Sequence, residues 1–190
     1  MLKRKLILLF LLITISNYAQ IGGKYVYQFL NLTPSPRQAA LGGKTVTVVD
    51  YDVNQAIYNP ATINGKMNNQ LAVNYGSYYG EVSYGSGAYA YTWDRHVQTF
   101  HTSVQYVNYG TFEGYDELGN ATSDFTGSEA ALSFGYAYNI PWTDFYVGAN
   151  VKLISSTLES YNSWGAATDL GFLYIDERND INIGVSIRNL

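Results

Sequence analysis

Few residues of this 190-residue chain have the types and spacing that catalysis requires. The two histidines, His96 and His101, lie five positions apart, and neither belongs to a His-Glu-x-x-His metal motif. No Gly-x-Ser-x-Gly nucleophile motif is present, although a Ser-His-Asp site assembled in space stays an open alternative. We interpret His101 as a hydrogen-bonded wall residue. The absence of Cys excludes disulfides, thiolate metal sites and cysteine nucleophiles.

Two further stretches have the composition of ligand-binding loops but lack the required spacing. Asp116-Glu117-Leu118-Gly119-Asn120 does not supply the spaced oxygen ligands of an EF-hand, so we interpret it as a solvated turn. Gly42-Gly43 lies in no strand–loop–helix phosphate motif and indicates a tight backbone instead. We therefore expect no metal, no cofactor and no enzymatic activity. The net charge of −4, without a basic block, argues against nucleic acid as a partner.

The first nineteen residues have the layout of a secretory signal peptide. Lys3, Arg4 and Lys5 precede an apolar run over residues 6–15, and Ala19 offers a small residue at a cleavage position. Ten residues are too few to span a bilayer, and an uncleaved anchor or a core helix is the alternative. The sequence therefore predicts an exported protein that begins at Gln20.

Residues 20–67 show no long hydrophobic period and hold three of the four prolines. Asp52 is placed to cap a helical turn over Val53–Tyr58, which Asn59-Pro60 would end. We expect this segment to act as a hatch, whose structural residues are Gly42, Gly43, Asn59, Pro60 and Ala61. Asn59 is the predicted anchor, because a carboxamide both donates and accepts hydrogen bonds.

From Leu71 onward the hydrophobic period is two, which predicts about seven antiparallel strands. The clearest strand alternates Leu132, Phe134 and Tyr136 with small residues, and the last alternates Ile181, Ile183 and Val185 with polar ones. The inward and outward faces of the first two strands, near residues 71–78 and 82–93, are ambiguous from the sequence alone.

Two architectures produce this alternation, and they differ in which face meets water. A soluble barrel or sandwich carries many charges outside, whereas an outer-membrane barrel has an apolar outside and a polar lumen. Charged residues are 14% of the chain, against about 25% in typical soluble domains, and aromatic residues are 16%. The polar faces consist mainly of Gly, Ser, Asn and Thr.

The connections and aromatic residues favour the membrane barrel as well. Short turns alternate with longer polar connections at Gly110–Gly127 and Ser155–Ser163. Aromatic residues gather at both ends of the strands, as in membrane-interface girdles: Trp93, Trp142, Phe145 and Tyr174 at one end, and Tyr75, Tyr84, Tyr106, Tyr109, Tyr161 and Trp164 at the other. A soluble sheet with ordinary cross-strand aromatic pairs is the alternative.

The predicted fold is therefore all-β, a transmembrane antiparallel β-barrel with an N-terminal hatch. Residues 68–190 would form its first half, because bacterial barrels close with an even number of strands. The lumen-facing side chains would include His101, Asn150, Asp169 and Arg188. We expect the chain to lie in the outer membrane and to contact its lipid.

Several motifs support a family resemblance along the whole chain. They are Gly22-Gly23-Lys24-Tyr25-Val26-Tyr27-Gln28-Phe29-Leu30-Asn31-Leu32, Ser35-Pro36-Arg37-Gln38-Ala39-Ala40-Leu41-Gly42-Gly43, Asp52-Val53-Asn54-Gln55-Ala56-Ile57-Tyr58-Asn59-Pro60-Ala61, Leu71-Ala72-Val73-Asn74-Tyr75 and Gly165-Ala166-Ala167-Thr168-Asp169-Leu170-Gly171. Together they resemble the PorQ family of the type IX secretion system of Bacteroidota. The Asn-Pro-Ala motif is less specific, since the related PorV proteins and FadL-type barrels share it.

The resemblance implies a FadL-like barrel with an N-terminal hatch, in which no residue is catalytic. It also implies that the chain docks partner proteins of a surface attachment complex, with PorZ as the closest associate and PorU and PorV as further members. A FadL-like channel for hydrophobic small molecules is the alternative function, and an outer-membrane enzyme is a third.

Overall fold

The computed structural model describes residues 26–94 and 97–190. The predicted signal peptide, residues 20–25 of the predicted hatch, and His96 lie outside the described residues.

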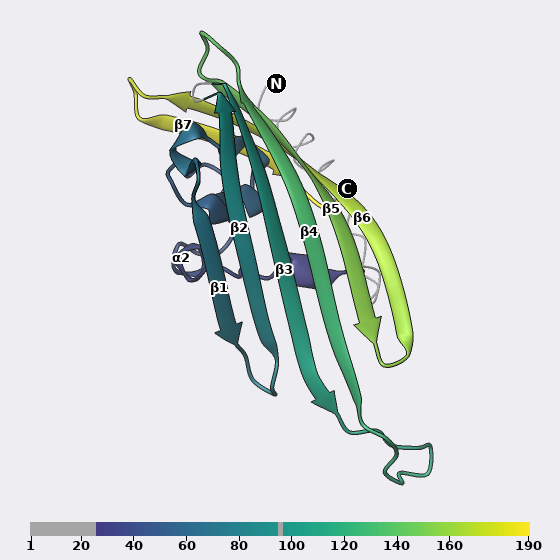
Figure 1. Ribbon diagram of the computed structural model, residues 1–190. Helices are drawn as coiled ribbons and strands as arrows, with labels where there is room; N and C mark the ends of the chain where they lie inside the picture. The colour runs from purple at the N-terminus through teal and green to yellow at the C-terminus, as the bar shows by residue number, and fades with distance from the viewer. Residues whose placement is uncertain (1–25, 95–96) are drawn as a thin grey trace, which may run out of the picture.

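Seven β-strands form one antiparallel sheet in which each strand pairs with the next along the chain. The sheet curls into an open half-barrel (Figure 1), so the all-β prediction and the expected strand number are confirmed. The strands are β1 (Leu71–Ser77), β2 (Ser83–Asp94), β3 (Gln98–Phe112), β4 (Phe125–Asn139), β5 (Phe145–Leu158), β6 (Tyr161–Asp176) and β7 (Ile181–Ile187).

Burial alternates along the strands with the predicted period of two. Large apolar side chains on the outer face are exposed, among them Phe134, Val151 and Ile183, while small and polar side chains on the inner face are buried. The structure also resolves the faces of β2: Ser86, Ala88 and Ala90 are buried, whereas Tyr89 and Tyr91 are exposed. The sheet thus exposes its apolar face and covers its polar one.

In the described residues before β1, the regular structure consists of five short helical turns. They are η1 (Gln28–Asn31), α2 (Pro36–Ala40), η2 (Val53–Ile57), η3 (Pro60–Thr62) and η4 (Gly65–Met67). The predicted cap is confirmed, because the Asp52 side chain accepts a hydrogen bond from the Asn54 amide at the start of η2. Across residues 26–94 and 97–190, no helix has the length and apolar character needed to cross a membrane.

Residues 26–67, called the N-terminal segment below, lie on the concave side of the sheet (Figure 1). Its turn η2 contacts β1, β2 and β3, while η3 contacts β4, β5 and β6. One short segment can reach both halves of a curled sheet only from inside the curl. The hydrophobic core lies at this junction, where Phe29 and Leu30 pack against Val107 and Ile154, and Ile63 packs against Ala137.

One of the two predicted long connections is wrong. Residues 113–124 form a loop that extends beyond the sheet (Figure 1), but Ser155–Ser163 is largely strand. Ser156 pairs with Ser163 and Thr157 with Asn162, so Glu159 and Ser160 alone make the turn. The polar composition that indicated a loop belongs to extended strand ends, where hydroxyl and amide side chains pair across the two strands.

The predicted aromatic girdles are also corrected in part. Trp93, Trp142, Tyr75, Tyr161 and Trp164 are exposed. Tyr84 and Tyr109 instead pack against the buried cluster around Phe29. Strand parity explains the difference, because Tyr84 lies two residues from the inward Ser86 and Tyr109 two residues from the inward Val107.

Candidate functional site

Glycines on the concave face let the N-terminal segment approach the sheet backbone closely. A Cβ atom added at Gly148 would collide with the Pro60 carbonyl, and one added at Gly171 would collide with the Asn59 side chain. On β7, a Cβ at Gly184 would collide with the Val46 carbonyl oxygen. Only residues without a side chain allow η3 and the chain around Val46 to lie at this depth.

Asn59 lies at the centre of this contact and is 0% exposed. Its Nδ2 donates to the Val46 carbonyl oxygen at 2.7 Å, and its Oδ1 accepts from the Ala61 amide at 3.0 Å. Pro60 opens η3, where its missing N–H leaves no unpaired donor. The neighbouring Ser186 of β7 donates to the Tyr58 carbonyl oxygen at 2.8 Å.

Gly42 and Gly43 follow α2 and do not lie in this contact. Both have positive φ angles, 92° and 100°, a region that favours glycine. The Gly43 amide donates to the Gln38 carbonyl oxygen at 2.8 Å and so helps to end α2. Their place in the fold is thus a turn within the N-terminal segment.

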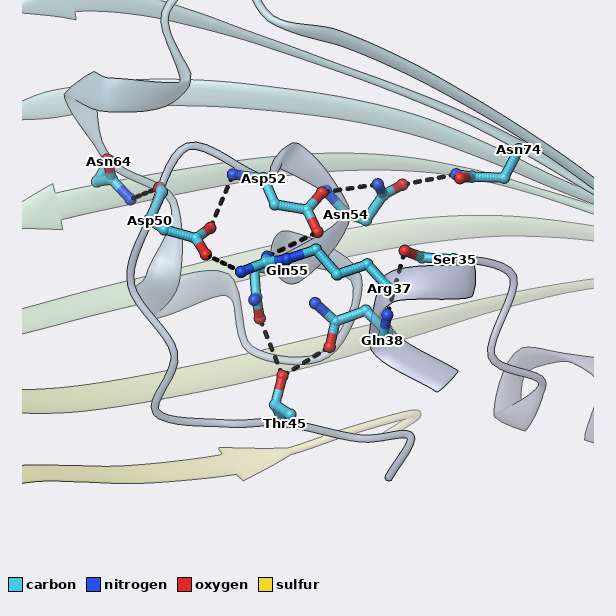
Figure 2. A network of polar contacts seen from close by, with 10 residues as sticks. All are labelled: Ser35, Arg37, Gln38, Thr45, Asp50, Asp52, Asn54, Gln55, Asn64 and Asn74. Carbon is cyan, nitrogen blue, oxygen red and sulfur yellow. Dashed lines mark hydrogen bonds and ion pairs between the residues drawn. The ribbon is translucent and has the colours of Figure 1, made fainter. Parts of the chain in front are cut away.

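A network of polar contacts holds the N-terminal segment together (Figure 2). Arg37 bonds Asp50 at 2.5 Å and Asp52 at 3.1 Å, and these contacts, with Asp50 the stronger, raise the pKa of the guanidinium above its usual value. Asp52 also accepts from the Asn54 side chain. Asn74 of β1 donates to the Asn54 side chain at 2.8 Å, which connects the network to the sheet.

The hydroxyl of Thr45 lies at the lower edge of this network (Figure 2). It is 2.7 Å from Gln38 Oε1 and 3.0 Å from Gln55 Oε1. Both glutamines are 0% exposed. Since a hydroxyl has one hydrogen to donate, the Thr45 hydroxyl can donate to only one of the two oxygens at a time. Its position between them places Thr45 at the contact between α2 and η2.

A buried ion pair lies on the concave face of β5 and β6. Lys152 Nζ is 2.7 Å from Asp169 Oδ2, and the two side chains are 2% and 0% exposed. Asn150 Nδ2 donates to the Ala56 carbonyl oxygen at 3.0 Å and lies 3.3 Å from Asp169 Oδ2. Asn189 completes the cluster, since its Oδ1 accepts from Lys152 at 2.8 Å.

The four predicted lumen residues all lie on the concave side but do not form one site. Asn150 and Asp169 share the ion-pair cluster, and Arg188 donates from Nη2 to the Leu30 carbonyl oxygen at 3.1 Å. His101 of β3 is buried and faces Ala90 and Gly135 in the neighbouring strands. Among the described residues it bonds none of the other three, and no group of His, Asp or Glu there could hold a metal ion.

Lys152 and Asn189 belong to this cluster, and the sequence analysis singled out neither. The period of two predicts that Lys152 points inward on its strand, as Asp169 does on the next predicted strand. Opposite charges on the same face of adjacent strands are the signal that would have identified the pair.

Several cavities border the N-terminal segment. One, about 570 Å³, lies at the short-turn end of the sheet, where Lys66, Tyr146 and Glu177 contribute to its lining. A second, about 420 Å³, lies between the N-terminal segment and β1, where Arg37, Asn54 and Asn74 contribute to its lining. A third, about 390 Å³, lies between η1 and residues 188–190, and its lining includes Gln28, Asn31 and Arg188.

No family model matches this chain, and no curated protein matches it.

Proposed function

We propose that this chain is part of an outer-membrane β-barrel that docks partner proteins of the type IX secretion system at the cell surface. The observation that carries the membrane location is the inverted polarity of the sheet. Its convex face exposes large apolar side chains, while its concave face is polar and covered by the N-terminal segment. Soluble proteins rarely expose so extended an apolar surface, whereas lipid-facing strands require it.

The loop 113–124 is the surface that we propose for partner docking. Leu118 at its tip is 88% exposed and Tyr115 is also exposed. The Asp116 carboxylate accepts from the amides of Leu118 and Asn120, so the tip has a defined conformation. In a bacterial barrel the longer loops face outward, where this loop would meet PorZ, and with it PorU and PorV, the partners implied by the resemblance.

The channel alternative receives less support from the geometry. The six strands β1 to β6 lie against the helical turns of the N-terminal segment, and hydrogen bonds from Asn150 and Ser186 hold its backbone. A pathway along the concave face would require this segment to leave a position that glycine contacts and buried hydrogen bonds stabilise.

Cell fractionation followed by copurification tests the proposal. We expect the tagged full-length protein in the outer-membrane fraction, together with proteins of the attachment complex. Leu118→Asp should abolish copurification of the partners while leaving membrane insertion intact. Leu41→Asp, at an exposed leucine of the N-terminal segment, is the matched control and should retain them. Recovery in the soluble fraction contradicts the membrane location, and equal copurification by both variants contradicts docking at this loop.

A further inference from the structure

The ion-pair cluster of the concave face brings an amine, a carboxylate and a carboxamide into contact. Lys152 Nζ lies 2.7 Å from Asp169 Oδ2 and 2.8 Å from Asn189 Oδ1. The carboxamide carbon of Asn189 is bonded to that oxygen, about 1.2 Å from it, and therefore lies within about 4 Å of the lysine nitrogen. An amine beside a carbonyl carbon, with a carboxylate that can carry its proton, has the groups that amide transfer requires.

The backbone around Asn189 aims its side chain at Lys152. The Asn189 amide donates to Asp169 Oδ1 at 2.9 Å. The next residue, Leu190, exchanges backbone hydrogen bonds of 3.0 and 3.2 Å with Thr168 of β6. Residues 188 and 189 therefore both lie opposite Asp169, which is the arrangement of a β-bulge. A bulge re-aims a side chain, and the positive φ of 56° at Asn189 is a conformation that asparagine tolerates.

Exclusion of water makes the lysine nitrogen available for reaction. The side chains of Lys152 and Asp169 are 2% and 0% exposed. Transfer of one proton from the ammonium to the carboxylate replaces two buried charges with two neutral groups. The amine that results has a free electron pair and no shell of water, so it is a nucleophile.

We propose that this cluster is a modification site, at which an isopeptide bond joins Lys152 Nζ to the carboxamide carbon of Asn189. Asp169 takes one proton from the lysine, and the amine then adds to the Asn189 carbon. The lysine nitrogen gives up a second hydrogen, while the bond from the carbon to Asn189 Nδ2 breaks. One of the two hydrogens completes the departing ammonia, and the other stays on Asp169, which ends as a neutral acid. No oxidant, reductant or further reactant is needed.

The bond would join β5 to the residues that follow β7, across β6. A covalent link between distant segments restricts the unfolded chain and so stabilises the folded sheet. The ion pair of Lys152 and Asp169 is the unlinked form of the cluster, and stabilisation by opposite charges belongs to that form. The bond requires neither a membrane nor a docked partner, so it is independent of the proposed function.

Peptide mass spectrometry of the full-length protein tests this site. The protein is denatured and digested with trypsin, which cleaves after a free lysine but not after an acylated one. In the wild type we expect a branched peptide that contains Lys152 and the segment beginning at Asn189. Its mass should be lower than that of the two segments together by one ammonia, about 17 Da. Cleavage after Lys152 should be lost in the linked chains.

Three variants assign the roles within the cluster. Asn189→Ala removes the carboxamide, so the branched peptide should be absent and cleavage after Lys152 should return. Asp169→Asn keeps both joined residues but removes the proton carrier, and it should also stay unlinked. Asn182→Ala, at an exposed asparagine of β7, is the matched control and should retain the link.

The wild-type digest decides the question even where a variant does not fold. Complete cleavage after Lys152 in the wild type, without a branched peptide, overturns the site. A branched peptide that persists in Asp169→Asn overturns the proton transfer through Asp169.

Discussion

Lys152 and Asp169 show what a buried charge requires in this molecule. Both side chains are buried and form an ion pair with each other. Asn150 also contacts Asp169, and Asn189 accepts a hydrogen bond from Lys152. Removing one member of such a pair leaves the other charge buried without a partner, in surroundings that cannot solvate it. The stability of the concave face therefore depends on both residues being present together.

We predict that Lys152→Met lowers the free energy of unfolding by about 3–5 kcal/mol, because Asp169 is left buried without its cation. Lys66→Met, at an exposed lysine, should change it by less than about 0.5 kcal/mol. Urea unfolding in detergent, followed by tryptophan fluorescence, measures both. Asp169→Leu combined with Lys152→Met should recover much of the loss. A double variant as unstable as the single one would show that the charge is not the cause.

The sequence predicted which face each of these residues occupies but not that they meet. The face follows from the period of two, which any strand obeys. The contact depends on register: Asn150 pairs with Asp169 across β5 and β6, which brings Lys152 diagonally next to Asp169. That register is set by the tight turn at Glu159 and Ser160, where the sequence analysis expected a longer connection.

At the scale of elements, the N-terminal segment packs closely against the sheet at positions where the strands carry glycine. The glycines of β5, β6 and β7 were visible in the sequence as members of a small-residue face. Their contact with Pro60 and Val46 was not, because it joins segments about a hundred residues apart and depends on the whole curl of the sheet. The cap at Asp52 is local, within two residues, and was correctly predicted from the sequence.

Gly171→Ala tests this fit. The added methyl group would overlap the Asn59 side chain, and overpacking of this kind costs about 1–3 kcal/mol. Gly87→Ala is the matched control, since its methyl group would meet Val104 at an ordinary 3.5 Å. Urea midpoints of the two variants provide the comparison. Equal midpoints would show that the N-terminal segment shifts away without cost.

Asn59→Ala tests the anchor of the same segment. The change leaves the Val46 carbonyl and the Ala61 amide without their buried partner, at a cost of about 1–3 kcal/mol. We expect limited proteolysis to cut residues 26–67 faster than in the wild type, with the strands still protected. Asn182→Ala, on the exposed part of β7, should leave the rate unchanged. A wild-type segment cut as fast as an unfolded peptide would contradict a docked segment.

At the scale of the whole molecule, the exposed apolar face decides which solvent the sheet requires. Val151 at mid-strand is 51% exposed, and Leu118 in the loop is 88% exposed. If water covered both, Arg at either position would cost little. If lipid covers the sheet, Val151→Arg near the bilayer midplane should lower the free energy of unfolding by about 2–4 kcal/mol. Leu118→Arg, in the loop beyond the sheet, should leave the free energy of unfolding almost unchanged. Folding into lipid vesicles, monitored by urea titration, measures the difference. Equal tolerance of Arg at the two positions would contradict a lipid-facing sheet and leave its apolar surface to a protein partner instead.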